Sequence, residues 1–473
     1  MSVSWTGHNV GVSSQFWMSI ASDSTGTKLA ACNSAFGGVE GGLIYTSTDS
    51  GSIWNPQNLT GGQDWHSIAS SSDGSKLAAV VFGGNIYTST DSGTTWTPQT
   101  SAGSQNWSSI ASSTNGNKLA AVFYGGNIYT STNSGITWTP QTSAGSQNWY
   151  SIASSSNGSK LAAVVQNGNI YTSTNSGLNW TEQTSAGSQN WSSIASSSNG
   201  TKLAAVVQNG YIYTSTDSGS TWTEQTSAGS QNWSSIASNS DGNYLAAVVQ
   251  NGYIYISSDS GTTWTEQTSA GSGLWQSIAS NSDGTRLAAV VFGGSVIYTG
   301  FNSSACYNYD TKILTNNGYV PIQDLKKGDL VQTYLHGYKP VDLIGKGVLH
   351  NKPNDFKECM YKLEKTEENG LTEDLIVTGG HSILVDELSD AYLNKCKENN
   401  IRNWETVVID DKKLLLAGLS DDFSKLTDTN QYTYYHFTLE AEDETTRYGI
   451  YANGILSETP SKKQFLTYRF FHF

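Results

Sequence analysis

The hydrophobic and polar residues of the first 300 positions alternate in short segments that recur along the chain. Each repeat holds four of them, such as Trp-Ser-Ser-Ile-Ala-Ser, Lys-Leu-Ala-Ala-Val-Val, Tyr-Ile-Tyr-Thr-Ser-Thr and Thr-Trp-Thr-Glu-Gln-Thr, separated by turn pairs such as Asn199-Gly200. Alternation of β-branched and aromatic residues between such turns predicts antiparallel strands. No repeat carries the 3.6-residue apolar period of a helical solenoid.

Tryptophan sets the length of the repeat. Two series of tryptophans advance in steps of 42 residues, apart from a first gap of 48 in the second series. The first is Trp54, Trp96, Trp138, Trp180, Trp222 and Trp264, and the second is Trp17, Trp65, Trp107, Trp149, Trp191, Trp233 and Trp275. Four strands in each repeat of this length predict the blades of a β-propeller.

The N-terminal segment is expected to complete the last blade. Seven repeats begin with Trp-x-Ser-Ile-Ala-Ser, but only six continue to the Gly-x-x-Trp segment, and the last stops at Gly300. The missing strand lies at the other end, where Ser4-Trp5-Thr6 precedes Trp17. Hydrogen bonds between the first and last blades would remove the exposed sheet edges. We therefore predict a seven-bladed propeller over residues 1–300.

Beyond residue 305 the repeats end and charged residues become denser. Residues 1–305 carry 6 Lys/Arg and 13 Asp/Glu, whereas residues 306–473 carry 19 and 26. We expect a linker over residues 301–305, a second all-β domain over 306–459 and an aromatic C-terminal tail over 460–473. The predicted class of the whole chain is all-β.

Composition excludes several functions and locations. The net charge is −14 without a basic stripe, so we expect no nucleic-acid partner. The four cysteines show no Cys-x-x-Cys spacing, which favours a reducing compartment, and no motif calls for a cofactor or a metal. No apolar run approaches the roughly 18 residues of a transmembrane helix. The N-terminus lacks a signal peptide, so we expect cytoplasmic synthesis.

The hairpin of each propeller repeat reads Ser-x-Asp/Asn-x-Gly-x-x-Trp, as in residues 47–54. This pattern resembles the Asp-box (BNR) repeat of sialidases and sortilin-like receptors. The resemblance implies that the acid or amide binds the backbone of the turn, that Gly takes a positive φ and that Trp packs between sheets. A sialidase needs several arginines around the carboxylate of its substrate. Arg286 is the only arginine before residue 305, so we do not expect this activity.

A ring of equivalent repeats suits multivalent binding of a glycan or a protein ligand. Gln147-Asn148-Trp149 and its copies starting at Gln105, Gln189 and Gln231 combine amides with an aromatic face, a composition suited to sugars. The alternative is a purely structural ring, in which the tryptophans are core residues and the amides line loops.

The second domain opens with a cysteine and holds three further motifs. Cys306 is followed by an Asp-Leu-x-x-Gly-Asp segment ending at Asp329, by Thr378-Gly-Gly-His381 and by a block around His436. Together these resemble the Hint domain of inteins and hedgehog proteins. The resemblance covers about 155 residues of the chain.

The resemblance implies that the chain cuts itself. The thiol of Cys306 would attack the carbonyl of Ala305, an amide that resonance otherwise protects. Thr378 and His381 would hydrogen-bond this peptide and protonate its nitrogen. The product is a thioester, formed by an N–S acyl shift, that water, a thiol or an amine would then attack. His436 occupies the position where inteins often carry an assisting Asp.

Splicing is not expected. Inteins end in His-Asn, whereas Glu458 and Thr459 stand at these positions, so the domain would cleave without ligating. The alternative is a non-enzymatic structural or glycan-binding propeller with an inactive Hint domain. Near-perfect repeats joined to a Hint module resemble coat or surface proteins of large DNA viruses, which implies a place on a virion or cell surface.

Overall fold

The computed structural model describes residues 3–10, 15–35, 42–57, 62–301, 307–351, 353, 359–398, 408–441, 443, 446–460 and 471–472. The chain divides into two compact units, Ser2–Phe301 and Asn302–Phe473. Both consist mainly of antiparallel strands, as predicted for an all-β chain.

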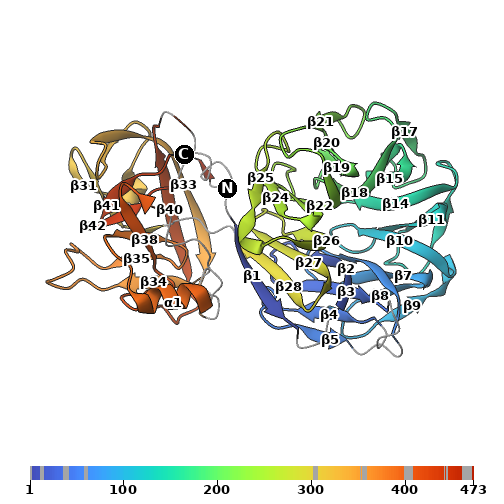
Figure 1. The fold of residues 1–473 in the computed structure, drawn as a ribbon, viewed down its shortest axis with the longest axis horizontal. Coiled ribbons are helices and arrows are strands. Elements are labelled where there is room, and N and C mark those ends of the chain that lie inside the picture. Colours follow the sequence, from blue (N-terminus) through green and yellow to red (C-terminus); the bar gives the residue numbers. More distant parts are fainter. Residues whose placement is uncertain are drawn as a thin grey trace. The chain divides into compact units, whose positions relative to one another are not determined.

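The first unit is a propeller of 28 strands in seven blades of four. In Figure 1 the blades follow one another from blue through green to yellow. The strands of blades 1 to 3 are β2 (Gln15–Ser22), β3 (Leu29–Ser34), β4 (Ile44–Ser47), β5 (Asn55–Gln57), β6 (Trp65–Ser70), β7 (Leu77–Gly84), β8 (Ile86–Ser89), β9 (Thr97–Gln99), β10 (Gln105–Ser112), β11 (Leu119–Gly126), β12 (Ile128–Ser131) and β13 (Thr139–Gln141). Those of blades 4 to 6 are β14 (Gln147–Ser154), β15 (Leu161–Gly168), β16 (Ile170–Ser173), β17 (Thr181–Gln183), β18 (Gln189–Ser196), β19 (Leu203–Gly210), β20 (Ile212–Ser215), β21 (Thr223–Gln225), β22 (Gln231–Ser238), β23 (Leu245–Gly252), β24 (Ile254–Ser257) and β25 (Thr265–Gln267).

The seventh blade joins the two ends of this unit. It holds β26 (Gly273–Ser280), β27 (Arg286–Gly294), β28 (Val296–Phe301) and β1 (Ser4–Asn9). β1 pairs antiparallel with β28 from Ser4 opposite Phe301 to Asn9 opposite Val296, and Figure 1 shows the two strands side by side. The predicted seven blades, closed by the N-terminal strand, are confirmed.

Each blade packs on the next through its conserved aromatic and basic positions. The tryptophan of every first strand is buried, and Trp65, for example, belongs to one apolar cluster with Cys32 and Ile44 of the preceding blade. The ammonium group of Lys118 donates to the hydroxyl of Ser176 in the following blade at 3.1 Å. The buried Arg286 makes the matching contact with Ser50, so the ring closes with the kind of link that lysines make at five other junctions. Tyr244 stands at this position in the sixth blade.

The hairpin turns show why the Ser-x-Asp/Asn-x-Gly pattern recurs. In the first one the hydroxyl of Ser47 donates to a carboxylate oxygen of Asp49 at 2.7 Å and accepts from the N–H of Gly51 at 2.9 Å. The same carboxylate oxygen accepts from the N–H of Ile53 at 2.9 Å. Gly51 has a φ of 89°, which a residue with a β-carbon adopts only with strain. The turn is therefore held by its own side chains.

The second unit is a 15-stranded sheet with one helix, α1 (Asp390–Glu398). Its strands are β29 (Tyr307–Asn308), β30 (Lys312–Thr315), β31 (Gly318–Pro321), β32 (Leu330–Gln332), β33 (Tyr338–His350), β34 (Met360–Leu363), β35 (Leu375–Thr378), β36 (Ser382–Val385), β37 (Val408–Ile409), β38 (Lys412–Leu416), β39 (Ser424–Lys425), β40 (Gln431–Leu439), β41 (Gly449–Ala452), β42 (Ile455–Glu458) and β43 (Phe471–His472).

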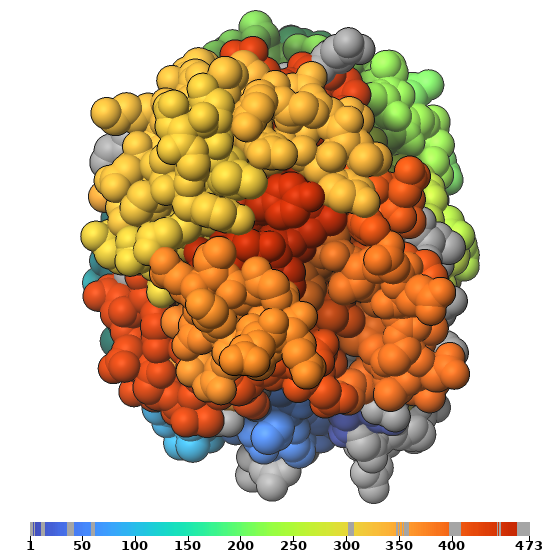
Figure 2. All heavy atoms as spheres, turned by 90° about the vertical axis from the view of Figure 1, so that its left-hand side faces the viewer, coloured from blue at the N-terminus to red at the C-terminus, as the bar shows by residue number. Residues whose placement is uncertain are grey.

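Strands from the two ends of this domain lie next to one another. β29 pairs with both β35 and β40, β30 pairs with β41, and β36 pairs with β42. In the space-filling view, red spheres from the C-terminal strands lie between the yellow and orange spheres of earlier strands (Figure 2). This interleaving brings the first residues of the domain to its last strand.

Candidate active site

His381 lies at the end of a tight turn between β35 and β36. Its backbone N–H donates to the carbonyl of Thr378 at 2.9 Å, which folds the Thr-Gly-Gly-His segment back on itself. The side chain of His381 is fully buried, and that of Thr378 is nearly so. The structure therefore brings these two predicted site residues together in one turn.

The imidazole of His381 has two close neighbours from distant parts of the chain. Its Nε2 lies 2.6 Å from the hydroxyl oxygen of Ser457 on β42. The ring of Tyr307 meets it edge to face, with centroids 4.4 Å apart. Its other nitrogen, Nδ1, is buried and has no hydrogen-bond partner among the described residues. Nε2 is thus held by a hydrogen bond, whereas Nδ1 is available to bind another group.

Burial lowers the pKa of His381 to about 3, and the positive charge of Arg447 adds to the shift. The imidazole is therefore neutral at pH 7. A neutral imidazole carries a proton on one nitrogen and a lone pair on the other, so it can serve as either an acid or a base.

Ser457 controls which nitrogen of His381 carries the proton. Its hydroxyl is fully buried and also lies 3.3 Å from the carbonyl oxygen of Ser382. When the hydroxyl donates to Nε2, the ring proton must sit on Nδ1. When it donates to the carbonyl of Ser382, Nε2 carries the proton and Nδ1 presents a lone pair. Rotation of one hydroxyl therefore links the two tautomers.

Tyr307 is anchored from three sides. Its backbone pairs with Val377 of β35 and with Tyr435 of β40. Its hydroxyl donates to the backbone carbonyl of Glu458 at 2.8 Å, and its side chain is fully buried. A residue held in this way cannot shift along the sheet without breaking buried hydrogen bonds, each of which costs about 1–3 kcal/mol to leave unmade.

A buried acid completes the surroundings of His381. The carboxylate of Glu458 accepts from the N–H of Ser382 at 3.0 Å and forms an ion pair with Arg447. The side chain of Glu458 is 3% exposed and that of Arg447 is 24% exposed. The charge of the acid is thus balanced inside the domain. Glu458 is also tied to the backbone of β36.

The remaining predicted site residues fall in two places. His436 is fully buried on β40, next to Tyr435, and its described ring contact is with Tyr434 at 6.4 Å. Ala305 and Cys306 lie outside the described residues, which resume at Tyr307.

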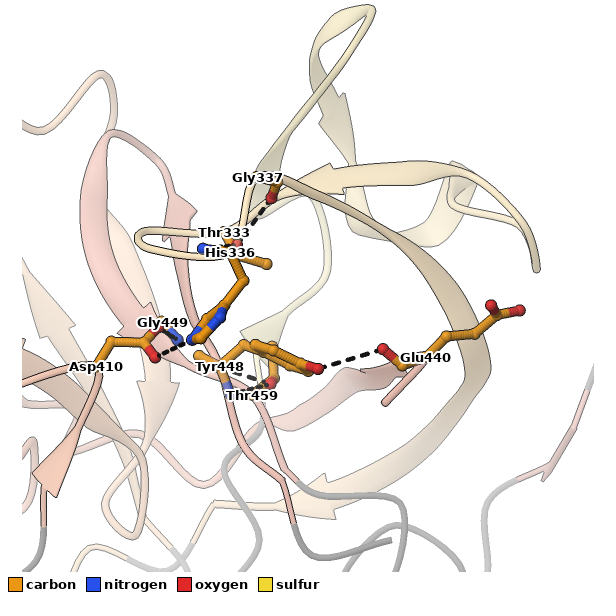
Figure 3. Close-up of polar contacts among 8 residues, drawn as sticks. All are labelled: Thr333, His336, Gly337, Asp410, Glu440, Tyr448, Gly449 and Thr459. Atoms are coloured by element: carbon orange, nitrogen blue, oxygen red, sulfur yellow. Dashed lines mark hydrogen bonds and ion pairs between the residues drawn. The ribbon is translucent and has the colours of Figure 1, made fainter. Parts of the chain in front are cut away.

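A polar cluster supports the strand pair that carries Ser457 (Figure 3). The imidazole of His336 lies 2.8 Å from a carboxylate oxygen of Asp410, whose second oxygen accepts from the N–H of Gly449 at 2.9 Å. The N–H of Tyr448 donates to the hydroxyl of Thr459 at 3.2 Å, and the N–H of Thr459 donates back to the carbonyl of Tyr448 at 2.9 Å. Thr459 therefore has a structural role in this strand pair.

Sequence reasoning missed Tyr307, Ser457 and Arg447 as members of this site. Only the place of Tyr307 directly after the expected nucleophile was a usable signal. The described residues contain no group of three or more His, Cys, Asp or Glu side chains that would hold a metal ion. In the same part of the chain, no helix is long and apolar enough to cross a membrane.

Three comparisons relate this chain to known proteins. Residues 305–463 match the Hint domain family. No curated protein matches the chain. The structure of YCF48 bound to D1 peptide is 15% identical and covers 62% of this chain and 96% of its own, with a TM-score of 0.49. YCF48 from Cyanidioschyzon merolae is 18% identical and covers 63% and 98%, with a TM-score of 0.48.

Proposed function

We propose that the Hint domain cleaves the peptide bond between Ala305 and Cys306 through a thioester on the Cys306 sulfur. The observation that carries this proposal is the contact between His381 and Tyr307. A neutral, buried imidazole with one available nitrogen is held against the residue that directly follows the proposed nucleophile. Chemistry at the preceding peptide bond needs such a group close by.

The proposed steps conserve atoms and protons. The thiol of Cys306 adds to the carbonyl carbon of Ala305, and the lone pair of the neutral His381 imidazole takes up the thiol proton. His381 delivers a proton to the amide nitrogen as the C–N bond breaks, which leaves a thioester and the free amine of Cys306. A nucleophile such as water, a thiol or an amine then takes the acyl group and releases the thiol. The contact with Ser457 lets His381 hold the proton on either nitrogen.

The reaction stops at cleavage. Splicing inteins release themselves when a terminal Asn cyclises, and here Thr459 stands at that position. Its hydroxyl cannot cyclise onto the backbone in that way, and Glu458 is bound by Arg447 and by the N–H of Ser382. The second domain therefore has no residue for the final step of splicing.

The module released by cleavage is the propeller, residues 1–305. We infer that it is not a sialidase, because its single arginine, Arg286, is buried in the contact with Ser50. A closed ring with complete blades needs nothing downstream for its fold, since β28 ends at Phe301. The propeller is thus suited to be a stable product, and we assign it a binding role.

Intact-mass measurement of the purified chain tests the proposal. We expect wild type to yield fragments 1–305 and 306–473, with faster release when hydroxylamine or dithiothreitol is present, since both attack thioesters. Cys306→Ala should stay full length under the same conditions. A wild-type chain that stays intact with both reagents would overturn the proposal, as would cleavage of the Cys306→Ala chain at the same bond.

A further inference from the structure

The propeller repeats differ from one another at several sets of positions, and one of these sets lies where neighbouring blades meet. At each junction the end of a second strand lies opposite the start of the next first strand. We call these seven facing pairs the junction ring: Phe292 and Phe16, Ser34 and Asp64, Phe82 and Asn106, Tyr124 and Asn148, Gln166 and Asn190, Gln208 and Asn232, Gln250 and Leu274.

Exposed hairpin residues such as Ser52, Ile136 and Leu178 vary between repeats in the same way, whereas one exposed loop does not. A loop Thr-Ser-Ala-Gly-Ser precedes the first strand of five blades and is identical in all five copies, at residues 100–104, 142–146, 184–188, 226–230 and 268–272. Its threonine is exposed in each copy, and none of the five makes a side-chain hydrogen bond within the described residues. An exposed and unbonded residue has thus stayed constant while the junction ring, a few residues away, has changed.

The ring surrounds the axis of the propeller. The first strands of adjacent blades contact one another in a closed cycle through β2, β6, β10, β14, β18, β22 and β26, so they are the innermost strands. Each junction pair includes a residue at the start of such a strand. Two aromatic residues that follow on these first strands, His66 and Tyr150, extend the junction ring. The ring of His66 lies 5.8 Å from that of Phe82, and Tyr150 follows Trp149 on β14.

One arc of the junction ring presents aromatic faces. Phe16 and Phe292 lie 5.0 Å apart across the seventh junction. Phe82 and Tyr124 at the second and third junctions are 45% and 49% exposed, and Tyr150 beside them is 39% exposed. Exposure on this scale leaves ring faces open to a ligand.

The opposite arc presents carboxamides. The side-chain amide of Asn190 donates to Gln208 at 2.9 Å, and that of Asn232 donates to Gln250 at 3.1 Å. Each amide has two donors and two acceptor lone pairs, so these bonds fix its orientation and leave further capacity. Among the fourteen members of the ring, Asp64 is the only charged residue and there is no Lys or Arg.

We infer that the junction ring binds a neutral oligosaccharide. The C–H face of a sugar ring packs on an aromatic face, and hydroxyls, which donate and accept, match carboxamides. The absence of basic residues from the ring disfavours phosphorylated or acidic ligands. A protein partner would instead need a contiguous apolar centre, which the amide arc interrupts. This site is independent of the proposed cleavage.

Calorimetric titration of the full-length Cys306→Ala chain with chitohexaose, cellohexaose and mannohexaose tests the inference. We expect at least one of the three to bind with a Kd between about 10 μM and 1 mM. Tyr124→Ala and Tyr150→Ala should each weaken it about tenfold, since each removes one stacking face. Tyr124→Phe keeps the face and should bind within about threefold of its parent. Thr184→Ala in the constant loop is the matched control and should change nothing.

The other results all count against the inference. No heat from any hexasaccharide at about 10 mM would overturn it. So would binding that survives both tyrosine substitutions, because the ligand would then sit elsewhere. Selection of peptides from a random display library by the chain but not by its Tyr124→Ala variant, without saccharide binding, would assign the ring to a protein partner. Circular dichroism establishes that each variant is folded.

Discussion

The hydroxyl of Tyr307 donates a hydrogen bond of 2.8 Å to the backbone carbonyl of Glu458, which lies 151 residues further along the chain. This bond fastens the first strand of the Hint domain to its last one. It also places the residue next to the proposed nucleophile against His381. The two ends of the domain therefore meet at the site where we propose the reaction takes place.

Tyr307→Phe removes this bond and keeps the aromatic contact with His381. The net worth of one hydrogen bond is about 0.5–1.5 kcal/mol, so we expect cleavage to slow by roughly two- to tenfold. Gel densitometry of the cleaved fraction over time measures the rate. Tyr309→Phe changes an exposed tyrosine two residues away and is the control. Equal cleavage rates for the two variants would show that the hydrogen bond between Tyr307 and Glu458 does not help to position the reacting groups.

Ser457→Ala leaves Nε2 of His381 buried without its partner. We expect cleavage to fall by about tenfold or more, because the ring loses the contact that sets its orientation and tautomer. Ser457→Thr, which keeps a hydroxyl, should recover part of the rate. Ser382→Ala is a close control, since the buried hydroxyl of Ser382 has no hydrogen-bond partner among the described residues. If Ser382→Ala slowed the reaction as much, the effect would be one of packing alone.

The low pKa of His381 makes the Hint domain sensitive to acid. The unfolded chain takes up a proton near pH 6.5, whereas the folded domain resists it down to a pKa of about 3. Stability is therefore complete above pH 6.5 and falls as the pH drops below it, by up to about 1.4 kcal/mol per unit. Urea unfolding of the Cys306→Ala chain is carried out at pH 7 and at pH 5, with the protease sensitivity of the Hint domain as the readout. The comparison measures the loss in the free energy of unfolding. The Cys306→Ala chain that also carries His381→Gln should lose less free energy of unfolding between pH 7 and pH 5. An equal loss would contradict the assignment of this acid sensitivity to His381.

Glu458→Gln breaks the buried ion pair with Arg447. We expect the Hint domain to lose about 2 kcal/mol, below the usual 3–5 for a fully buried pair because Arg447 is partly exposed. Urea unfolding of the Cys306→Ala chain reports the change. Glu373→Gln, which breaks a solvent-exposed pair with Lys312, should cost much less. A similar loss in both variants would mean that burial adds nothing to the pair.

Trp5→Ala tests the closure of the ring. The side chain of Trp5 is 3% exposed on β1, so its removal should destabilise the propeller by about 3–5 kcal/mol. Thermal unfolding followed by tryptophan fluorescence measures the shift. Ile53→Ala removes an apolar side chain that is 63% exposed and should leave the unfolding temperature nearly unchanged. An unchanged temperature for Trp5→Ala would mean that β1 adds little to the ring.

The sequence predicted the propeller well because its information is local and repeated. One tryptophan period, one turn pattern and one missing strand were sufficient for seven blades and their closure by β1. The Hint site was predicted only where a short motif marks it, as at Thr378 and His381. The sequence did not predict Ser457 and Tyr307 as site residues. They lie 76 and 74 residues from His381 in the chain, and no local pattern encodes a contact over that separation.

The pairing of β1 with β28 also sets an order of events during synthesis. Phe301 leaves the ribosome 297 residues after its partner Ser4, a wait of roughly 15–60 s at usual elongation rates. Until then β1 lacks its partner strand in the seventh blade. His381 emerges 80 residues after Phe301. The propeller can therefore close before the part of the Hint domain that would cleave it has been synthesised.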